Sequence, residues 1–383
     1  MTTYILDART ATPHFPGIGR YVVNLAAALP AQLRAGERLH LLTPATNSGL
    51  PPDWATARPA VTTSAIPVSP FALAQQWAIP AALRPWRSGD GPGRAVYHST
   101  YYLMPYRPGL ATVLTVYDLI ALTRPETVSW RARLFFRLAT RLALAATEHV
   151  IAISTATRRD LQARFAIPPS RITTIPLAPA AHFRPPTEAT IAQARAAYHL
   201  PPHYYLYVGI NKPHKNLVRL VEAYALLEQD APPLLIGGAW DARYPAAKLR
   251  AAELGLGERV RFLGPIDDEF LPALYGACTL FIYPSRYEGF GLPVIEAMAC
   301  GAAVACSFAP GLEDAAGDAA LRFDPDDLAG LVAVLREAAT RSDVRAALRQ
   351  RGLTHARRFS WPRVAGETLA VYRDLAGRGA RTG

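Results

Sequence analysis

Short apolar segments that alternate with segments of helical periodicity dominate the chain. The first half carries runs rich in β-branched and aromatic residues, among them TTYILDA, ATVLTVYDLI and EHVIAIS. The second half repeats this pattern with runs such as HYYLYVGI and TLFIYPS. Strands that alternate with helices form βαβ units, in which the strands run parallel. The sequence therefore predicts an α/β protein built from doubly wound parallel sheets.

The length of 383 residues predicts two globular domains. Half of the residues are hydrophobic and 19% are charged, which supports two buried cores and argues against disorder. A proline-dense segment without helical periodicity, ITTIPLAPAAHFRPPTEAT, is typical of a linker. We therefore place one domain at residues 1–180, a second at 181–360 and a final helix at 361–383. Doubly wound sheets bind ligands at the carboxyl ends of their strands, so we expect the site between the domains.

Positive charge is concentrated in the first half of the chain. Residues 1–180 hold 18 Arg and no Lys against 8 Asp and Glu, a net charge of +10, whereas residues 181–383 hold 23 basic and 22 acidic residues. Such a field attracts polyanions or an anionic membrane face, and a solvated arginine-rich surface is an equally good explanation. No nucleic-acid motif or stacking strip accompanies the charge. We therefore expect no nucleic-acid partner.

The segment SWRARLFFRLATRLALA combines arginines with apolar residues. Arg133, Arg137 and Arg141 follow one another at four-residue spacing, beside an apolar row that starts at Trp130. A helix of this kind can lie on an anionic membrane. Because Arg131 falls within the apolar side, we favour a helix that packs on the sheet and leaves its arginines in solvent.

Targeting and cysteine patterns indicate a cytoplasmic protein. The first ten residues lack a basic segment that leads into an apolar stretch, and no run of about 18 apolar residues follows. Cys278, Cys300 and Cys306 show no CxxC spacing and lie among apolar residues, as expected for buried thiols in a reducing compartment. Peripheral contact with the inner membrane face is an additional expectation that rests on the basic first half.

Two glutamates flank a glycine-containing loop in the stretch PSRYEGFGLPVIEAMACG. Glu288 lies in the loop, and Glu296 is expected in the first turn of a helix that begins near Pro293, because proline is favoured at the first helical position. Gly289 and Gly291 permit close backbone approach, and the free N–H groups of a helix start suit a phosphate. For either glutamate taken alone, a solvated side chain or a helix cap is the simpler interpretation.

The same stretch, EGFGLPVIEAMACG, resembles the E-x7-E signature of the retaining glycosyltransferases of family 4, also called group 1. The resemblance implies a GT-B fold, in which two facing Rossmann-like domains hold the active site between them and the last helix crosses back onto the first domain. Seven further segments agree in order and spacing and extend the resemblance over nearly the whole chain: PGIGRYVVNL, TVYDLIAL, VIAISTATRRDL, YVGINKPHKNLVRLVEAY, VRFLGPIDDEFLPALYGA, AGDAALRFDPDD and FSWPRVAGETLAVYRDL.

The resemblance assigns donor-binding roles in the second half. Glu288 would contact the donor sugar, and Glu296 would bond the ribose of the nucleotide. Lys215 matches the lysine that neutralises the leaving diphosphate, a role that needs a fixed cation and no metal. The backbone near the sugar and diphosphate would be that of Gly289, Phe290, Gly291 and Leu292.

The second half departs from the family pattern at one position of the donor loop. Many members have an arginine directly after the strand glycine, whereas here Ile210 follows Gly209. The second charge of the diphosphate must then be met by another residue. The candidates are Asn211, Lys212 and His214.

The first half contributes candidates that would lie near the reaction centre. Gly17 and Gly19 stand between the first strand and its helix, where the family has a glycine-rich loop. Many relatives read H-D-L where this chain has Tyr117 before Asp118, so the role of the imidazole is lost or moves to the phenol, and we retain Asp118 as a site residue. His98, at another strand end, is a candidate for the acceptor side, although a lone histidine is more often structural.

The resemblance implies transfer of a hexose, with retention of configuration, from a nucleotide-diphosphate sugar to a hydroxyl of a glycan or of a polyprenyl-diphosphate-linked acceptor. The segments PGIGRY and YHSTYYLMPY look most like those of bacterial enzymes that use GDP-mannose to build surface polysaccharide, and UDP-hexose donors stay open. No cofactor and no metal are implied. Two other functions stay open, a GT-B sugar-nucleotide epimerase and a non-catalytic protein that binds anionic lipid or nucleic acid.

Overall fold

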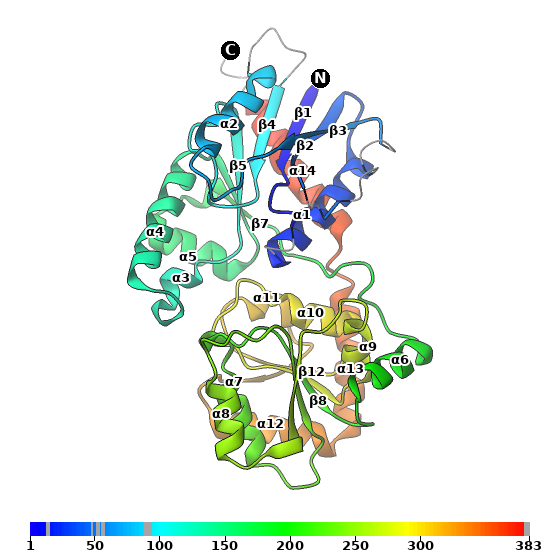
Figure 1. Ribbon diagram of the computed structural model, residues 1–383. Helices are drawn as coiled ribbons and strands as arrows, with labels where there is room; N and C mark the ends of the chain where they lie inside the picture. Colours follow the sequence, from blue (N-terminus) through cyan, green and yellow to red (C-terminus); the bar gives the residue numbers. More distant parts are fainter. Residues whose placement is uncertain (13–15, 47–48, 51–53, 55–57, 88–93, 379–383) are drawn as a thin grey trace. The chain divides into compact units, whose positions relative to one another are not determined.

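The computed structural model describes residues 1–12, 16–46, 49–50, 54, 58–87 and 94–378. Contacts between Cα atoms divide the chain into two compact units. Unit 1 consists of Met1–Leu122, Ser129–Leu177 and Ser360–Gly383, and unit 2 consists of Thr123–Val128 and Ala178–Phe359. Each unit contains one parallel sheet with helices packed against it (Figure 1). The predicted α/β class with doubly wound sheets is confirmed.

Unit 1 is built on a seven-stranded sheet in the order β3-β2-β1-β4-β5-β6-β7, in which every neighbouring pair is parallel. Because β1 pairs with β2 on one side and with β4 on the other, the strand order reverses between β1 and β4. The strands are β1 (Thr2–Asp7), β2 (Glu37–Pro44), β3 (Val61–Ile66), β4 (Arg94–Ser99), β5 (Ala111–Val116), β6 (His149–Ala152) and β7 (Ile172–Thr174).

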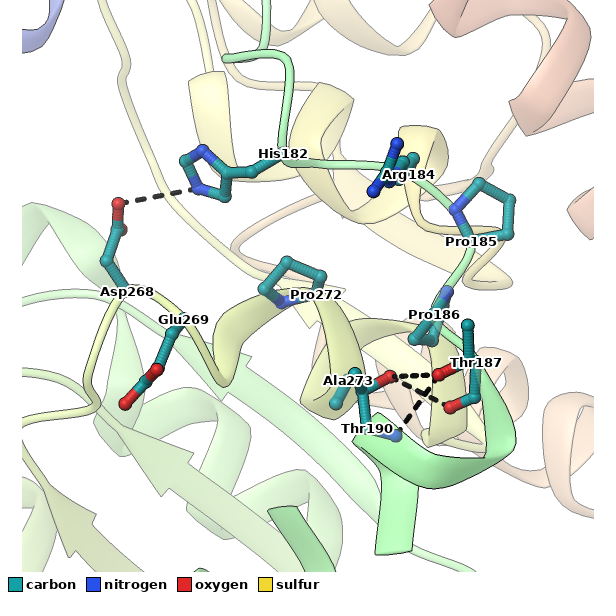
Figure 2. Close-up of a pocket in the computed structure, with 10 residues that line it drawn as sticks. All are labelled: His182, Arg184, Pro185, Pro186, Thr187, Thr190, Asp268, Glu269, Pro272 and Ala273. Atoms are coloured by element: carbon teal, nitrogen blue, oxygen red, sulfur yellow. Dashed lines mark hydrogen bonds and ion pairs between the residues drawn. The ribbon is translucent and has the colours of Figure 1, made fainter. Parts of the chain in front are cut away.

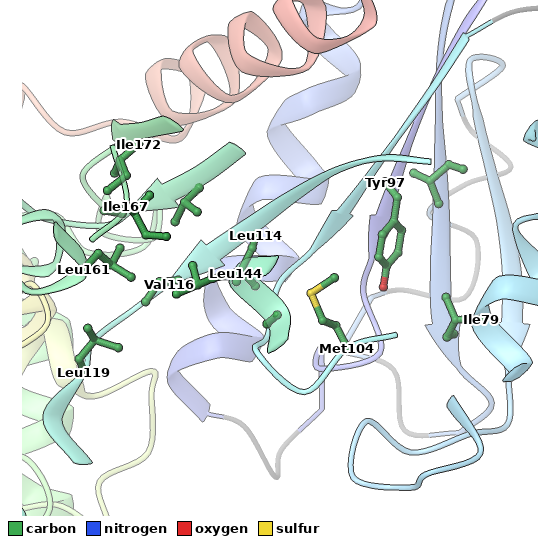
Figure 3. Packing of buried hydrophobic residues seen from close by; sticks show 14 of the residues in the cluster. Ile79, Tyr97, Met104, Leu114, Val116, Leu119, Leu144, Leu161, Ile167 and Ile172 are labelled. Atoms are coloured by element: carbon green, nitrogen blue, oxygen red, sulfur yellow. The ribbon is translucent and has the colours of Figure 1, made fainter. Parts of the chain in front are cut away.

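The core of unit 1 lies between this sheet and its helices. Figure 3 shows the buried cluster, in which Tyr97 and Leu114 of the sheet meet Ile79, Leu144 and Leu161 of three helices. The last helix of the chain also belongs to unit 1, where it packs against the first helix and the sheet. The helices of unit 1 are α1 (Pro16–Ala28), α2 (Gln75–Ala82), α3 (Ile120–Thr123), α4 (Trp130–Ala145), α5 (Thr155–Phe165) and α14 (Trp361–Arg378).

Unit 2 is built on a six-stranded parallel sheet in the order β10-β9-β8-β11-β12-β13. Its strand order reverses between β8 and β11. The strands are β8 (Tyr205–Val208), β9 (Leu234–Gly237), β10 (Val260–Gly264), β11 (Leu280–Tyr283), β12 (Val304–Ser307) and β13 (Leu321–Phe323). The helices are α6 (Glu188–Tyr198), α7 (Leu217–Ala225), α8 (Ala246–Glu253), α9 (Leu271–Ala277), α10 (Leu292–Ala299), α11 (Leu312–Ala316), α12 (Leu328–Thr340) and α13 (Ser342–Ala356).

Two local predictions were wrong. The proline-dense segment is not a linker along its whole length, because Ile172–Thr174 pair with β6 and form the edge strand β7. Gly17 and Gly19 do not lie in a loop, because α1 already begins at Pro16, and proline suits a first helical turn. Glycine is a weak helix former, so the pattern placed the helix start too late.

Cys278, Cys300 and Cys306 are buried and free, as predicted. Burial raises the pKa of the Cys278 and Cys306 thiols to about 12, so both stay protonated at neutral pH. None of the helices in the described part of the chain combines the length and apolar character that a transmembrane segment requires.

Candidate active site

The strand reversal of unit 2 brings two predicted site residues together. Lys215 ends a short 3-10 helix, η5 (Pro213–Lys215), that follows β8, and Glu288 lies in the loop between β11 and α10. Because β8 and β11 are parallel neighbours, the loops that follow them leave the same edge of the sheet. A ligand-binding crevice opens at such a reversal in doubly wound sheets.

Lys215 and Glu288 form a largely buried ion pair. The Lys215 Nζ lies 2.7 Å from Glu288 Oε1 and 2.9 Å from Oε2. It also donates a hydrogen bond of 3.0 Å to the Oη of Tyr283, the last residue of β11. The two charged side chains are only 12% and 10% exposed, so each depends on the other to offset its loss of hydration.

Two buried rings next to this ion pair, those of Tyr283 and His214, have shifted pKa values. The Tyr283 ring stacks on Tyr207 with 5.8 Å between the ring centroids. Burial, followed by the charge of Glu288, keeps the pKa of Tyr283 well above its usual range. Burial, followed by Lys215 and Lys212, lowers the pKa of His214 to about 3. At neutral pH the phenol and the imidazole are therefore uncharged.

The loop that carries Glu288 is held by close backbone contacts. The Glu288 N–H donates to the carbonyl of Pro310 at 3.0 Å. At Gly311, where φ is +88°, a Cβ would overlap the Glu288 carbonyl. Gly291, where φ is +91°, ends the loop and caps α10, and a Cβ there would overlap the side chain of Leu312. The glycines thus allow the approach of chain segments that sets the position of the Glu288 carboxylate.

Glu296 lies on α10, but not in its first turn as predicted. The helix begins at Leu292, one residue before Pro293, because the left-handed Gly291 serves as the cap. Glu296 is therefore in the second turn, where it is 3% exposed. Its charge contributes to the raised pKa of Tyr283. Phe290 is buried in the loop before α10.

The loop after β8 places the remaining donor-side candidates. A Cβ on Gly209 would lie 2.7 Å from the Tyr207 hydroxyl, which in turn donates to the Ile210 carbonyl. The Asn211 amide donates to the carbonyls of Asp241 and Tyr244 and accepts from the Asp241 N–H. Three hydrogen bonds thus tie the Asn211 side chain to the 241–244 segment.

In unit 1, Asp118 follows β5 and lines a small cavity of about 90 Å³ beside Tyr117, Tyr101 and Tyr102. One Asp118 oxygen accepts a hydrogen bond of 2.9 Å from the N–H of Ile120, at the start of α3. Within the described residues, the buried Tyr117 hydroxyl has no hydrogen-bond partner. The site role of Asp118 stays a prediction.

His98 and Gly19 occupy packed positions, but Gly17 does not. His98 is fully buried, its ring nitrogens lie 2.6 Å from the Tyr372 hydroxyl and 2.7 Å from the Thr115 hydroxyl, and burial lowers its pKa to about 3. Its contacts join β4 to β5 and to α14, which is a structural role. A Cβ on Gly19 would lie 3.2 Å from two carbonyls of the loop after β1, whereas Gly17 is exposed.

Comparison with known proteins decides the family. Residues 16–178 match the family described as "Glycosyltransferase Family 4", and residues 193–355 match "Glycosyl transferases group 1". The O-antigen chain mannosyltransferase B of Escherichia coli is 32% identical over 287 residues, which is 73% of this chain and 74% of that protein. The chain belongs to the group 1 glycosyltransferases of family 4. The predicted family and enzyme class, a hexosyltransferase, are confirmed.

Other matches place this glycosyltransferase among proteins of the GT-B fold. The serotype-specific mannosyltransferase WbdA of Escherichia coli is 34% identical over 180 residues, or 46% of this chain and 22% of that longer protein. Sucrose-phosphate synthase from Thermosynechococcus elongatus has 25% identity and a TM-score of 0.75, with 99% of this chain and 100% of that chain covered. The predicted GT-B fold is confirmed.

Sequence reasoning missed two residues near the glycosyltransferase's lysine. Tyr283 carries no motif, and its position as the last residue of a strand was the only signal available. Arg124 belongs to the short segment of the first half that packs with unit 2, and its guanidinium donates to the Arg286 carbonyl at 3.0 Å. Within the described residues, no group of three His, Cys, Asp or Glu side chains is arranged to hold a metal ion.

A larger cavity of the glycosyltransferase lies elsewhere in unit 2. It measures about 460 Å³ and lies between the segment that leads into α6 and the start of α9 (Figure 2). His182 and Asp268 pair across it, with 3.4 Å between Nε2 and Oδ2. No predicted site residue lines this cavity, so its size alone does not make it the site of transfer.

Proposed function

We propose that the protein transfers a hexosyl group, with retention of configuration, from a nucleotide-diphosphate sugar to a hydroxyl of a glycan or of a polyprenyl-diphosphate-linked acceptor. The single observation that carries the proposal is the cluster of Lys215, Glu288 and Tyr283 at the strand reversal of unit 2. Mannose from GDP-mannose is the favoured donor, because relatives in Escherichia coli are named as mannosyltransferases. A UDP-hexose is the alternative donor.

Lys215 supports the departure of the diphosphate. As the bond between the sugar carbon and the diphosphate oxygen breaks, its electron pair goes to that oxygen and negative charge develops there. A fixed ammonium group in a site of low dielectric stabilises such charge more than water does. Glu288 positions hydroxyls of the sugar, and we assign no covalent intermediate to it. Glu296 is assigned to the ribose and the backbone of residues 289–292 to the diphosphate.

The ion pair offsets the cost of burying both groups before the donor binds. An unpaired buried charge costs several kcal/mol, on the order of 3–5 when one partner is removed. In the free protein, Glu288 neutralises Lys215. When the donor binds, phosphate oxygens take over as partners of the ammonium, and the Glu288 carboxylate becomes available to sugar hydroxyls. One charge pairing thus replaces another.

Lys212 is our assignment for the second diphosphate charge, which Ile210 cannot meet. Of the three candidates, His214 is neutral at neutral pH and the Asn211 amide is tied to the 241–244 segment. Lys212 is half-buried beside them and keeps a flexible ammonium. We expect Lys212→Gln to raise the donor KM about tenfold and to change kcat less. Unchanged donor KM would remove Lys212 from the site.

Donor stabilisation followed by product analysis tests the proposed function. GDP, UDP and ADP and their sugars are compared by thermal unfolding, because a ligand at 100 times its Kd stabilises the native state by about 2.7 kcal/mol. The stabilising donor is then incubated with glycan and lipid-linked acceptors, and the anomeric configuration of the product is read by NMR. We expect GDP-mannose and a retained linkage. An epimerised sugar formed without acceptor would instead support the epimerase.

A further inference from the structure

Helix α4 turns most of its large apolar side chains outward. It packs on unit 1 through Phe136 and through small or aliphatic residues of its second half, with Leu144 pointing into the core cluster (Figure 3). The helix therefore packs on unit 1 and leaves its arginines exposed, as the sequence favoured. The outward apolar side chains are 42–66% exposed and comprise Trp130, Leu134, Phe135, Leu138 and Leu142.

Positive charge borders this apolar row. Arg133, Arg137 and Arg141 are exposed along α4, which contains no acidic residue. Arg133 and Arg137 also line a cavity of about 490 Å³ together with Arg164 of α5 and apolar residues that include Trp130. Across residues 16–46, 58–87 and 94–378, no carboxylate forms an ion pair with the arginines of this cavity. The helix thus offers an apolar strip beside unpaired guanidinium groups.

We propose that the outward face of α4, with Arg164, docks on an anionic phospholipid surface. Apolar side chains would enter the boundary between headgroups and acyl chains, and the guanidinium groups would bind lipid phosphates. Charge complementarity selects this occupant, since the surrounding unit carries most of the positive charge of the chain. In a symmetric dimer formed through this face, arginines of the two copies would face one another, and like charges repel. The inference stands apart from the catalytic proposal, because the face contains none of the site residues.

Vesicle flotation tests the inference with the full-length protein. Vesicles of neutral phosphatidylcholine are compared with vesicles that contain phosphatidylglycerol, at low and at physiological salt. We expect binding to the anionic vesicles that weakens as salt rises. Arg133→Gln/Arg137→Gln/Arg141→Gln should lower the affinity on the order of a hundredfold, since each basic group near such a surface contributes about fivefold. Leu134→Gln/Leu138→Gln should reduce binding at every salt concentration.

Matched variants in unit 2 test whether vesicle binding depends on the α4 face or on surface charge and hydrophobicity in general. Arg195→Gln/Arg351→Gln/Arg357→Gln removes three exposed arginines, and Leu249→Gln replaces a leucine that is 57% exposed. Both controls should bind vesicles like the wild type. Unfolding temperature and nucleotide-induced stabilisation, measured for every variant, show that the fold and the donor site are intact.

Several outcomes would overturn the docking proposal. Wild-type protein that stays unbound with anionic vesicles at low salt contradicts it, as does equal loss of binding in the α4 and control variants. A dimer in analytical ultracentrifugation that the Leu134→Gln/Leu138→Gln variant dissolves would assign the face to a second copy. Tight binding of duplex DNA in place of vesicles would assign it to nucleic acid.

Discussion

At the scale of single residues, the candidate site depends on a residue that no motif marks. The E-x7-E signature predicted Glu288, and the PHKN segment predicted Lys215, but neither indicated that these two side chains form one ion pair. Tyr283 became visible only when the sheet placed the end of β11 beside η5. Contacts between residues 68 or 73 positions apart cannot be read from local sequence patterns.

We expect Tyr283→Phe to lower kcat about tenfold with little change in the donor KM. The variant keeps the ring that stacks on Tyr207 but loses the hydrogen bond to Lys215, which contributes about 1–3 kcal/mol when a charge takes part. The measurement is steady-state transfer kinetics. Tyr205→Phe is the control, because it removes a buried hydroxyl of the same sheet that bonds the Leu335 carbonyl. Equal activity loss in both variants would mean that Tyr283 acts only through stability.

Gly311 tests whether backbone approach sets the Glu288 carboxylate. Gly311→Ala and Gly36→Ala both place a Cβ on a left-handed residue, at a cost of about 1–2 kcal/mol. Only at Gly311 does the Cβ meet another chain segment, since nothing lies within 4 Å at Gly36. We expect Gly311→Ala to lose most transfer activity and Gly36→Ala to keep it. The unfolding free energies of both variants are measured as the control for stability. Full activity of Gly311→Ala would show that the loop adapts freely.

At the scale of elements, a partly buried ion pair joins α14 to β2. Arg373 donates two hydrogen bonds of 2.8 Å to the carboxylate oxygens of Glu37. These bonds lower the pKa of Glu37 to about 2. The folded-state pKa lies below the unfolded value of about 4.3, so the stabilisation is complete above that pH and is lost as the pH falls toward 2.

We expect Glu37→Gln to lower the unfolding free energy by about 1–3 kcal/mol at pH 7, because a charged hydrogen-bonded pair is lost. The difference from wild type should stay constant between pH 8 and about 5 and shrink below pH 4.5. Denaturant unfolding at stepped pH measures it. A difference that persists unchanged at pH 3 would contradict the assigned pKa.

The elements also show which features the sequence alone could predict. Strands with a buried apolar run, such as β5 and β8, were predicted because their side chains pack on both faces. The edge strand β3 has the sequence VTTSAI, of which half of the residues are exposed and one is buried, and it carries no such signal. Helix α4 was predicted as a helix, but its outward apolar row depends on which face meets the sheet. Three-dimensional packing decided both features.

At the scale of the whole molecule, the net positive charge and the predicted donor-binding pair lie in different halves of the chain. The first half carries +10 and presents the α4 face, whereas the nearly neutral second half carries the Lys215 and Glu288 pair. The family was predictable because its motifs follow one another along nearly the whole sequence. The donor nucleotide and the acceptor were not, because their recognition depends on pocket shape rather than on motifs.

The most direct test of the central claim is the kcat/KM of sugar transfer for Lys215→Gln and Glu288→Gln with the donor that stabilises the protein. The control is Glu222→Gln, which breaks a more exposed ion pair with Arg250 in the same unit. We expect each site variant to lose at least about a hundredfold, equivalent to about 2.7 kcal/mol of transition-state stabilisation, and the control to stay within about threefold. Folded site variants that transfer sugar at nearly the wild-type rate would contradict the account.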